Sequence, residues 1–120
     1  MNKEIYLFYK NKKIKIKVKD CNFLEMSFGL MFSNKEKAKA LLFEFKKERK
    51  IIIHSFFVFY PFLALWCDKK NKILEIKKVY PFSFTIIPKF SSKKLIEIPL
   101  NKKYKNYKKI LQDFPSIRKI

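Results

Sequence analysis

The longest stretch of this chain without Lys, Arg, Asp or Glu covers seventeen residues, from Ile51 to Cys67. Such a stretch forms either a transmembrane helix or buried strands. About 20 apolar residues are usual for a membrane span, and this stretch contains His54 and Ser55 and is interrupted by Pro61. Most of its residues are aromatic or β-branched, which favours strands, and lysines flank both ends without the asymmetry that orients membrane proteins. We therefore predict two consecutive buried strands that break near Pro61, and no transmembrane segment.

Residues 13–19 alternate strictly between lysine and a β-branched apolar residue. Side chains of a strand point alternately to its two faces, so this pattern predicts one buried and one solvated face. The residues expected on the buried face are Ile14, Ile16 and Val18. The apolar residues 5–9 and a two-residue turn at Asn11 and Lys12 complete a predicted β-hairpin. A strand so early in the chain also indicates that no signal peptide precedes the domain.

Asn22 and Glu25 have the spacing of a capping box, in which each side chain bonds the backbone N–H of the other residue. They predict a short helix over residues 23–28. Gly29 is the only glycine of the chain, and it follows at the position where a helix ends on a left-handed residue. Residues 30–32 are apolar, and we expect them to enter the core.

The remaining residues predict further short strands joined by polar or proline-containing connections. Strands are expected at residues 41–45, 73–79 and 95–98. The expected connections are residues 33–39, 46–50, 68–72 and 80–90. Asn101 is expected to cap a C-terminal helix. The 120 residues are thus expected to form one domain of the mainly β (α+β) class. Its architecture would be a compact, barrel-like antiparallel or mixed sheet of about seven strands with one or two short helices.

The order and spacing of several short segments carry a likeness to a known family. These segments are Gly29-Leu30-Met31-Phe32, Leu41-Leu42-Phe43-Glu44-Phe45, Ile53-His54-Ser55-Phe56-Phe57, Tyr60-Pro61-Phe62, Asp68, Lys72-Ile73-Leu74-Glu75-Ile76-Lys77, Pro81, Pro88-Lys89 and Lys94-Leu95-Ile96-Glu97-Ile98-Pro99. Together they resemble the uncharacterised family known as domain of unknown function 192 (DUF192), and its archaeal branch in particular. The likeness is strongest over residues 13–101. It implies a compact β-barrel-like fold, and it implies no activity.

Three positions depart from what the resemblance implies. Met26 stands where the family often has Arg, and Leu63 stands where it usually has Asp. Ser55 stands where archaeal members favour Met. If the family's polar residues form a site, this chain lacks part of it.

The formal net charge is +19, and it comes from 27 Lys and two Arg set against 10 acidic residues. A charge of this size attracts polyanions such as nucleic acid or an acidic membrane surface. A composition rich in Lys, Asn, Ile and Phe is equally typical of an AT-rich genome, and the scarcity of Arg argues against sequence-specific reading of DNA. The candidate residues for polyanion contact are Lys89, Lys93, Lys94, Lys102 and Lys103.

The two cysteines, Cys21 and Cys67, lie far apart in the sequence. They indicate buried free thiols in a reducing, cytoplasmic setting. A disulfide between them is the alternative. We expect the protein to be a monomer.

The reactive side chains of the chain are few. His54 is the only histidine and Gly29 the only glycine, so a Ser-His-Asp triad and a phosphate-binding loop have little support. The single histidine and two unclustered cysteines predict no metal site, and we expect no cofactor. His54 could act as a general base or be a hydrogen-bonded core histidine. Glu97 alternates with Ile96 and Ile98, and Glu75 has the same pattern, so we expect both carboxylates to be solvated.

Candidate ligand-binding residues are the helix-ending glycine, the histidine and the aromatic residues of the proline loop. They are Gly29, His54, Tyr80, Phe82 and Phe84. The aromatic residues either stack on bases or fold down as a plug. The sequence most favours a non-enzymatic module that binds a small ligand or a partner protein. The alternatives are nonspecific polyanion binding through lysines and a small enzyme that uses His54 and Glu97.

Overall fold

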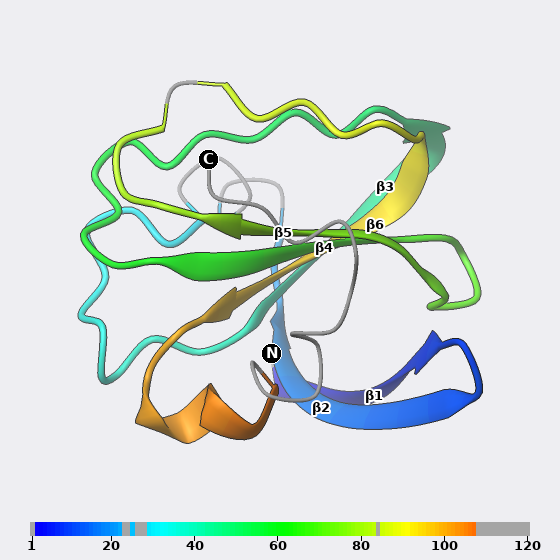
Figure 1. The fold of residues 1–120 in the computed structure, drawn as a ribbon, viewed down its shortest axis with the longest axis horizontal. Coiled ribbons are helices and arrows are strands. Elements are labelled where there is room, and N and C mark those ends of the chain that lie inside the picture. Colours follow the sequence, from blue (N-terminus) through cyan, green and yellow to red (C-terminus); the bar gives the residue numbers. More distant parts are fainter. Residues whose placement is uncertain (1, 23–24, 26–28, 84, 108–120) are drawn as a thin grey trace.

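The computed structural model describes residues 2–22, 25, 29–83 and 85–107. Its strands form one mixed sheet in the order β1-β2-β3-β6-β4-β5, which curls into a half-barrel (Figure 1). The elements are β1 (Asn2–Tyr9), β2 (Lys12–Asp20), β3 (Leu41–Arg49), β4 (Phe62–Cys67), β5 (Ile73–Val79), β6 (Ser92–Pro99) and the 3₁₀ helix η1 (Lys102–Tyr104). The mainly β class is therefore confirmed, with six strands in the described residues where we expected about seven.

The predicted hairpin is present as β1 and β2, and its turn lies one residue earlier than expected. Lys10 and Asn11 form the turn, and Lys10 has a φ of 53°. The strands pair antiparallel from the ends of this turn, with Leu7 opposite Ile14. The inward residues are buried as predicted: Ile14, Ile16 and Val18 are exposed by 6%, 1% and 2%.

The order of the strands places β6 in the middle of the sheet, antiparallel to both β3 and β4. The only parallel pairing of named strands is a short one, between the end of β2 and the start of β3. The two edge strands approach each other where the backbone N–H of Phe8 donates to the carbonyl oxygen of Asn71, at 3.0 Å. This contact brings the hairpin against the turn between β4 and β5, so the sheet nearly closes on itself.

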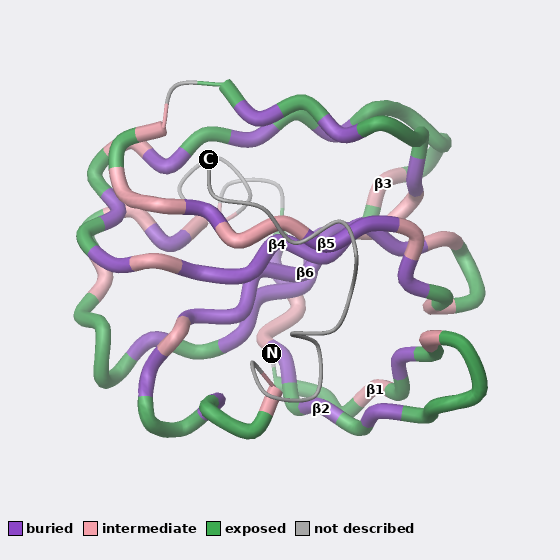
Figure 2. The backbone as a smooth tube through the Cα atoms, in the orientation of Figure 1, coloured by how far each residue is buried: buried purple, intermediate pink, exposed green. Residues whose placement is uncertain are grey.

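Both faces of the sheet are covered, which gives the domain two apolar cores. The inner core lies within the curl of the sheet and includes Leu7, Ile16, Leu42, Leu65 and Ile96. The outer core lies on the opposite face and includes Phe43, Ile53, Trp66, Ile86 and Leu95. Buried residues consequently follow one another without interruption along β4, while the turns at the ends are exposed (Figure 2).

The covering layer over the outer core consists of residues 51–60, 80–83 and 85–90, which run side by side along the top of Figure 1. Ile53 and Ile86 exchange two backbone hydrogen bonds, of 3.1 and 2.8 Å. The indole Nε1–H of Trp66 in β4 donates to the carbonyl oxygen of Ile51, at 2.8 Å. The first pair of bonds joins the two segments of the covering layer to each other, and the indole bond joins the layer to the sheet.

The uncharged stretch is thus one strand and one irregular segment. Its second half is β4, as predicted, but its first half forms no strand beyond the isolated bridge of Ile53 with Ile86. Its residues alternate between buried and exposed because the segment lies as a lid on the outer core. Among the described residues, no helix is long and apolar enough to cross a membrane.

Asn22 and Glu25 form the predicted capping box. The N–H of Glu25 donates to Asn22 Oδ1 at 2.9 Å, and the N–H of Asn22 donates to Glu25 Oε1 at 3.0 Å. Glu25 is helical, and the rest of the predicted helix lies outside the described residues. Leu30 enters the core as expected, but Phe32 is 67% exposed, so the expectation that all of residues 30–32 are buried is wrong.

The C-terminal part of the described chain begins with η1 and continues as helix over residues 105–107. The rest of the predicted helix lies beyond the described residues. Asn101 precedes η1 without making a side-chain cap, contrary to our expectation. Its Nδ2 donates instead to the carbonyl oxygens of Lys35 and Ala38, at 2.7 and 3.2 Å. The residue therefore holds the loop before β3.

Candidate functional site

A cavity of about 250 Å³ opens on the outer face of the sheet, between the residues after the helix and the covering layer. Ten of the thirteen described residues that line it are aliphatic or aromatic, and polar atoms also face the cavity. The lining residues are Gly29, Leu30, Met31, Phe43, Phe45, Ile51, Ile52, Ile53, His54, Val58, Phe62, Leu95 and Glu97. Three residues singled out from the sequence, Gly29, His54 and Glu97, therefore meet at one place.

Glu97 supplies the only carboxylate among these lining residues. It lies in β6 between Leu41 of β3 and Ala64 of β4, and it is 6% exposed. Loss of water on burial raises the pKa of its carboxyl to about 8. None of the described residues makes a hydrogen bond or an ion pair with this carboxyl group. The prediction that Glu97 is solvated is wrong, because the covering layer lies over the face to which it points.

Glu75 is buried for the same reason. It lies in β5 with 1% exposure, so the prediction of a solvated carboxylate fails here too. Unlike Glu97, it has partners. Its Oε1 accepts the backbone N–H of Lys89 at 2.7 Å, and its Oε2 lies 3.5 Å from Nζ of Lys77. Glu75 thus fastens the loop before β6 to the sheet, which gives it a structural role.

Gly29 stands next to the Glu97 carboxyl. Its backbone N–H donates to the carbonyl oxygen of Glu25 at 2.9 Å, and its φ is +53°. Gly29 therefore has the left-handed conformation that we predicted, and of the helix that it would end only Glu25 lies within the described residues. A Cβ at this position would lie 3.2 Å from Oε1 of Glu97 and 3.9 Å from the ring of Phe43. The absence of a side chain thus keeps this wall of the cavity close to the carboxyl without a clash.

Two further ionisable groups respond to the carboxyl electrostatically. Burial raises the pKa of the Tyr60 hydroxyl. A hydrogen bond with Ser33 lowers this pKa, and the negative charge of Glu97 makes a smaller contribution that raises it. Burial first, and then nearby carboxylates that include Glu25 and Glu97, raise the pKa of the Cys21 thiol to about 11. Cys21 is consequently a thiol at neutral pH and is a poor nucleophile.

His54 lies at the rim of the cavity and is exposed. Its Nδ1 accepts the backbone N–H of Phe56 at 3.2 Å, and the two rings lie 5.0 Å apart. The interpretation of His54 as a core histidine is therefore wrong. In the extended segment after Lys50, Ile51, Ile53 and Ser55 point inward, so His54 points outward by alternation.

The other predicted sites lie elsewhere. Tyr80 and Phe82 belong to the loop after β5 and do not line this cavity, while Phe84 lies outside the described residues. The two cysteines are free and buried, as predicted, and burial raises the pKa of the Cys67 thiol to about 12. Among the described residues, no group of three His, Cys, Asp or Glu side chains is placed to hold a metal ion.

The predicted polyanion-binding lysines do not form one patch. Lys89, Lys93 and Lys94 lie before and at the start of β6, and Lys102 and Lys103 follow its other end. An eight-residue strand separates the two groups by roughly 25 Å. Lys94 is also engaged, because its Nζ donates to Oδ1 of Asn71 at 2.6 Å.

Lysines do gather along a second hollow, a groove of about 500 Å³ between the hairpin and the segment that begins with η1. Its lysines are Lys15, Lys17, Lys39 and Lys103. Nζ of Lys15 is paired with Glu4 at 3.4 Å. These side chains stand on a solvated surface, where ion pairs contribute little.

Sequence reasoning missed a cluster of exposed phenylalanines at one end of the molecule. It consists of Phe32, Phe57, Phe59 and Phe82, with exposures of 67%, 47%, 60% and 48%. Only Phe82 was among the candidates. The aromatic content of residues 56–60 was the available signal, but an uncharged stretch indicates burial, so we assigned these rings to the core.

The fold and the cavity define a small, mainly β half-barrel domain with a covered outer face. No family model and no curated protein matches this chain. Two solved structures share its fold. One is a proposed transcription regulator from Sinorhizobium meliloti 1021, with 16% identity and a TM-score of 0.77 over 97% of this chain and 90% of that chain. The other is a protein of unknown function from Novosphingobium aromaticivorans DSM 12444, with 11% identity and a TM-score of 0.69 over 86% of this chain and 76% of that chain. At these identities the likeness concerns the fold alone.

Proposed function

We propose that the domain is a binding module for a small, largely apolar ligand with one polar group, which Glu97 recognises. The observation that carries the proposal is the Glu97 carboxyl, which is 6% exposed and has no hydrogen-bonding partner among the described residues. A buried polar group without a partner costs about 1–3 kcal/mol. Among the described residues, Oε2 of Glu75, Oγ of Ser92 and Oδ1 of Asn101 are also buried without a hydrogen-bond partner. Glu97 differs from them because it lines the cavity.

The chemistry of the pocket narrows the ligand class. With a pKa of about 8, the Glu97 carboxyl is mostly protonated at neutral pH, so it can donate a hydrogen bond to a neutral oxygen or nitrogen. A ligand amine could instead take the proton and pair with the carboxylate. Apart from Gly29 and His54, the other lining residues are aliphatic or aromatic and can contact an apolar body, while polar atoms also face the cavity. A cavity of about 150 Å³ holds benzene, so about 250 Å³ is enough for one ring with a short substituent.

Calorimetric titration of three one-ring probes tests the proposal. Benzylamine and benzyl alcohol carry one polar group, and toluene carries none. We expect the two polar probes to bind at least about tenfold more tightly than toluene, which corresponds to about 1.4 kcal/mol. Glu97→Gln should abolish the advantage of benzylamine and retain binding of benzyl alcohol. Equal affinity of all three probes for the wild type, or no binding of any, would contradict the proposal.

A second candidate is an enzyme that uses His54 and Glu97, because both residues line the same cavity. A carboxyl with a pKa of about 8 suits a general acid at neutral pH. The exposed position of His54 makes this the weaker candidate, since catalysis benefits from exclusion of water. Hydrolysis of 4-nitrophenyl acetate provides the test. A rate above that of free imidazole that falls in both His54→Gln and Glu97→Gln would favour an enzyme, and a rate equal to it would exclude this use of the pair.

We also propose that the chain is a divergent member of the DUF192 family. The order of the segments quoted from the sequence and the left-handed Gly29 support this assignment, while no family model matches the chain. Of the three departing positions, Leu63 lies in the inner core, away from the cavity, and Ser55 is buried in the covering layer. Met26 lies outside the described residues. A crystal structure of an undisputed family member that lacked the covering layer would contradict the assignment.

A further inference from the structure

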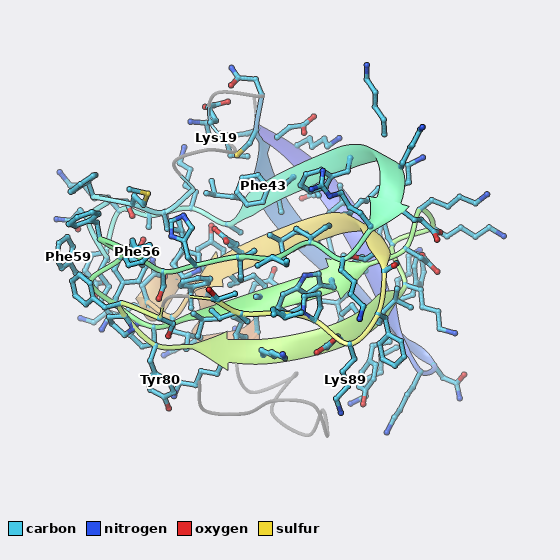
Figure 3. The ribbon with its side chains drawn as sticks, turned by 90° about the horizontal axis from the view of Figure 1, so that it is seen from above. Lys19, Phe43, Phe56, Phe59, Tyr80 and Lys89 are labelled. Atoms are coloured by element: carbon cyan, nitrogen blue, oxygen red, sulfur yellow. The ribbon has the colours of Figure 1, made fainter. Side chains whose placement is uncertain are left out.

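The aromatic cluster of Phe32, Phe57, Phe59 and Phe82 comes from three separate loops that meet at one end of the molecule. The rings of Phe32 and Phe57 are stacked with centroids 5.0 Å apart. Phe82 meets Phe57 and Phe59 edge-on, at 6.5 and 5.4 Å. Figure 3 shows Phe59 at the outer edge of this end, while nitrogen-tipped side chains project from the opposite end. The rings therefore form one continuous apolar surface exposed to solvent.

The backbone under this cluster holds an unfavourable conformation. Phe32, Phe57 and Phe82 have φ angles of 60°, 57° and 61°. For a residue with a side chain, the left-handed region costs about 1–2 kcal/mol. Two hydrogen bonds hold these residues in place: the N–H of Phe32 donates to the carbonyl oxygen of Phe57 at 2.9 Å, and that of Phe82 donates to the carbonyl oxygen of Ser55 at 3.0 Å. The left-handed backbone that turns these rings outward therefore lowers the stability of the fold.

The shape and charge around the cluster indicate what it contacts. The four rings line neither the cavity beside Gly29 nor the lysine groove, and each is about half exposed or more, so they lie on the outer surface. In the loop after Phe32, Lys35 and Lys37 are exposed and so is Glu36 between them, while Nζ of Lys78 lies over the ring of Tyr80, two residues before Phe82, at 5.0 Å. The whole chain carries a formal charge of +19. An exposed apolar surface on a strongly basic protein is suited to a bilayer that contains anionic lipids.

We propose that this end of the domain binds the surface of an anionic membrane, with the aromatic cluster inserted among the lipid headgroups. A second copy of the chain is a less suitable occupant, because two surfaces of the same strongly basic protein repel each other. Single-stranded nucleic acid is also less suitable. Base stacking needs free ring faces along a basic groove, and the adjacent faces of Phe32 and Phe57 are covered by each other.

Co-sedimentation with vesicles tests the proposal. The probe is a vesicle of 70% phosphatidylcholine and 30% phosphatidylserine. Phe59→Ser changes a ring of the cluster that is 60% exposed, and Phe90→Ser changes a ring outside the cluster that is 55% exposed. We expect Phe59→Ser to lower the partition coefficient about fivefold and Phe90→Ser to change it less than twofold. Unchanged fluorescence of the buried Trp66 verifies that both variants are folded.

Four outcomes would overturn the proposal. The first is no sedimentation of the wild type with these vesicles. The second is an equal effect of the two substitutions, which would leave only nonspecific attraction by lysine. The third is a loss of oligo(dT) binding in Phe59→Ser with vesicle binding unchanged, which would assign the cluster to nucleic acid. The fourth is a wild-type dimer that Phe59→Ser dissociates, which would assign it to self-association.

Discussion

A Cβ at Gly29 would lie 3.2 Å from Oε1 of Glu97, so the only glycine of the chain faces a buried carboxyl that has no hydrogen-bonding partner among the described residues. This proximity places Gly29 against β6, in the middle of the sheet. Two independent requirements meet at Gly29: a left-handed backbone, and space for the carboxyl. The candidate pocket depends on both.

Gly29→Ala should destabilise the fold through both requirements. The left-handed backbone costs about 1–2 kcal/mol for alanine, and the contact at 3.2 Å adds the displacement of the Glu97 side chain. In a Glu97→Ala background the second cost disappears. Urea unfolding of the four proteins, followed by Trp66 fluorescence, should therefore give a coupling free energy of about 0.5 kcal/mol or more. Strictly additive effects would show that the two residues do not contact each other.

The stability of the protein should fall with rising pH because of Glu97. Its pKa is about 8 in the folded protein against an ordinary value of 4.5. A carboxyl with a raised pKa contributes its stability in full below about pH 4.5 and loses it as the pH rises towards about 8. The limiting slope is about 1.4 kcal/mol per pH unit.

Glu97→Gln is the matched control, because it removes this titration and leaves every other ionisable group in place. The free energy of unfolding of the wild type relative to this variant should decrease between pH 5 and pH 8, by about 4 kcal/mol at most. Parallel pH profiles of the two proteins would show that Glu97 titrates normally.

Ser55 should be essential to the covering layer. Its side chain is fully buried, and its Oγ donates to the carbonyl oxygen of Tyr80 and accepts the N–H of Ser83, both at 2.7 Å. Ser55→Ala leaves both groups without this partner, and we expect a loss of about 1–3 kcal/mol in unfolding free energy. Ser91 is exposed, so Ser91→Ala should change stability by less than about 0.5 kcal/mol. Equal effects of the two substitutions on the unfolding free energy would contradict this role of Ser55 in the covering layer.

Nonspecific polyanion binding should be weak and sensitive to salt. The five lysines that we singled out lie in two groups at opposite ends of β6, so no single patch is formed. We expect binding of a 20-nucleotide oligo(dT) to decrease at least about tenfold between 50 and 200 mM salt, since it would depend on released counterions. Fluorescence anisotropy measures the effect. An affinity that is unchanged across this range would show that contacts other than phosphate–lysine attraction dominate.

The parts of the fold with a regular pattern were predictable from the sequence. Strict alternation with lysine predicted β2 and its inward residues, and the capping-box spacing was confirmed by both hydrogen bonds. The turn at Lys10 was misplaced by one residue, because a left-handed lysine has no distinct signal.

The candidate site was predictable only in part. Gly29, His54 and Glu97 were named as candidates, but alternation shows only which residues share a face of a strand, and it does not show whether that face is covered. Glu97 was therefore expected to be solvated, although the covering layer lies over its side of the sheet. The position of His54 was mispredicted for a related reason. Its neighbours Ile53 and Ser55 point inward, so the side chain of His54 points to solvent.

The most direct test of the account is the pKa of Glu97, measured from the pH dependence of its side-chain carboxyl ¹³C resonance and assigned by comparison with Glu97→Gln. The account places this carboxyl in an apolar cavity without a hydrogen-bonding partner, and it predicts a midpoint of about 8. A midpoint near the ordinary value of 4.5 would mean that the carboxyl is solvated, and it would contradict the proposed pocket.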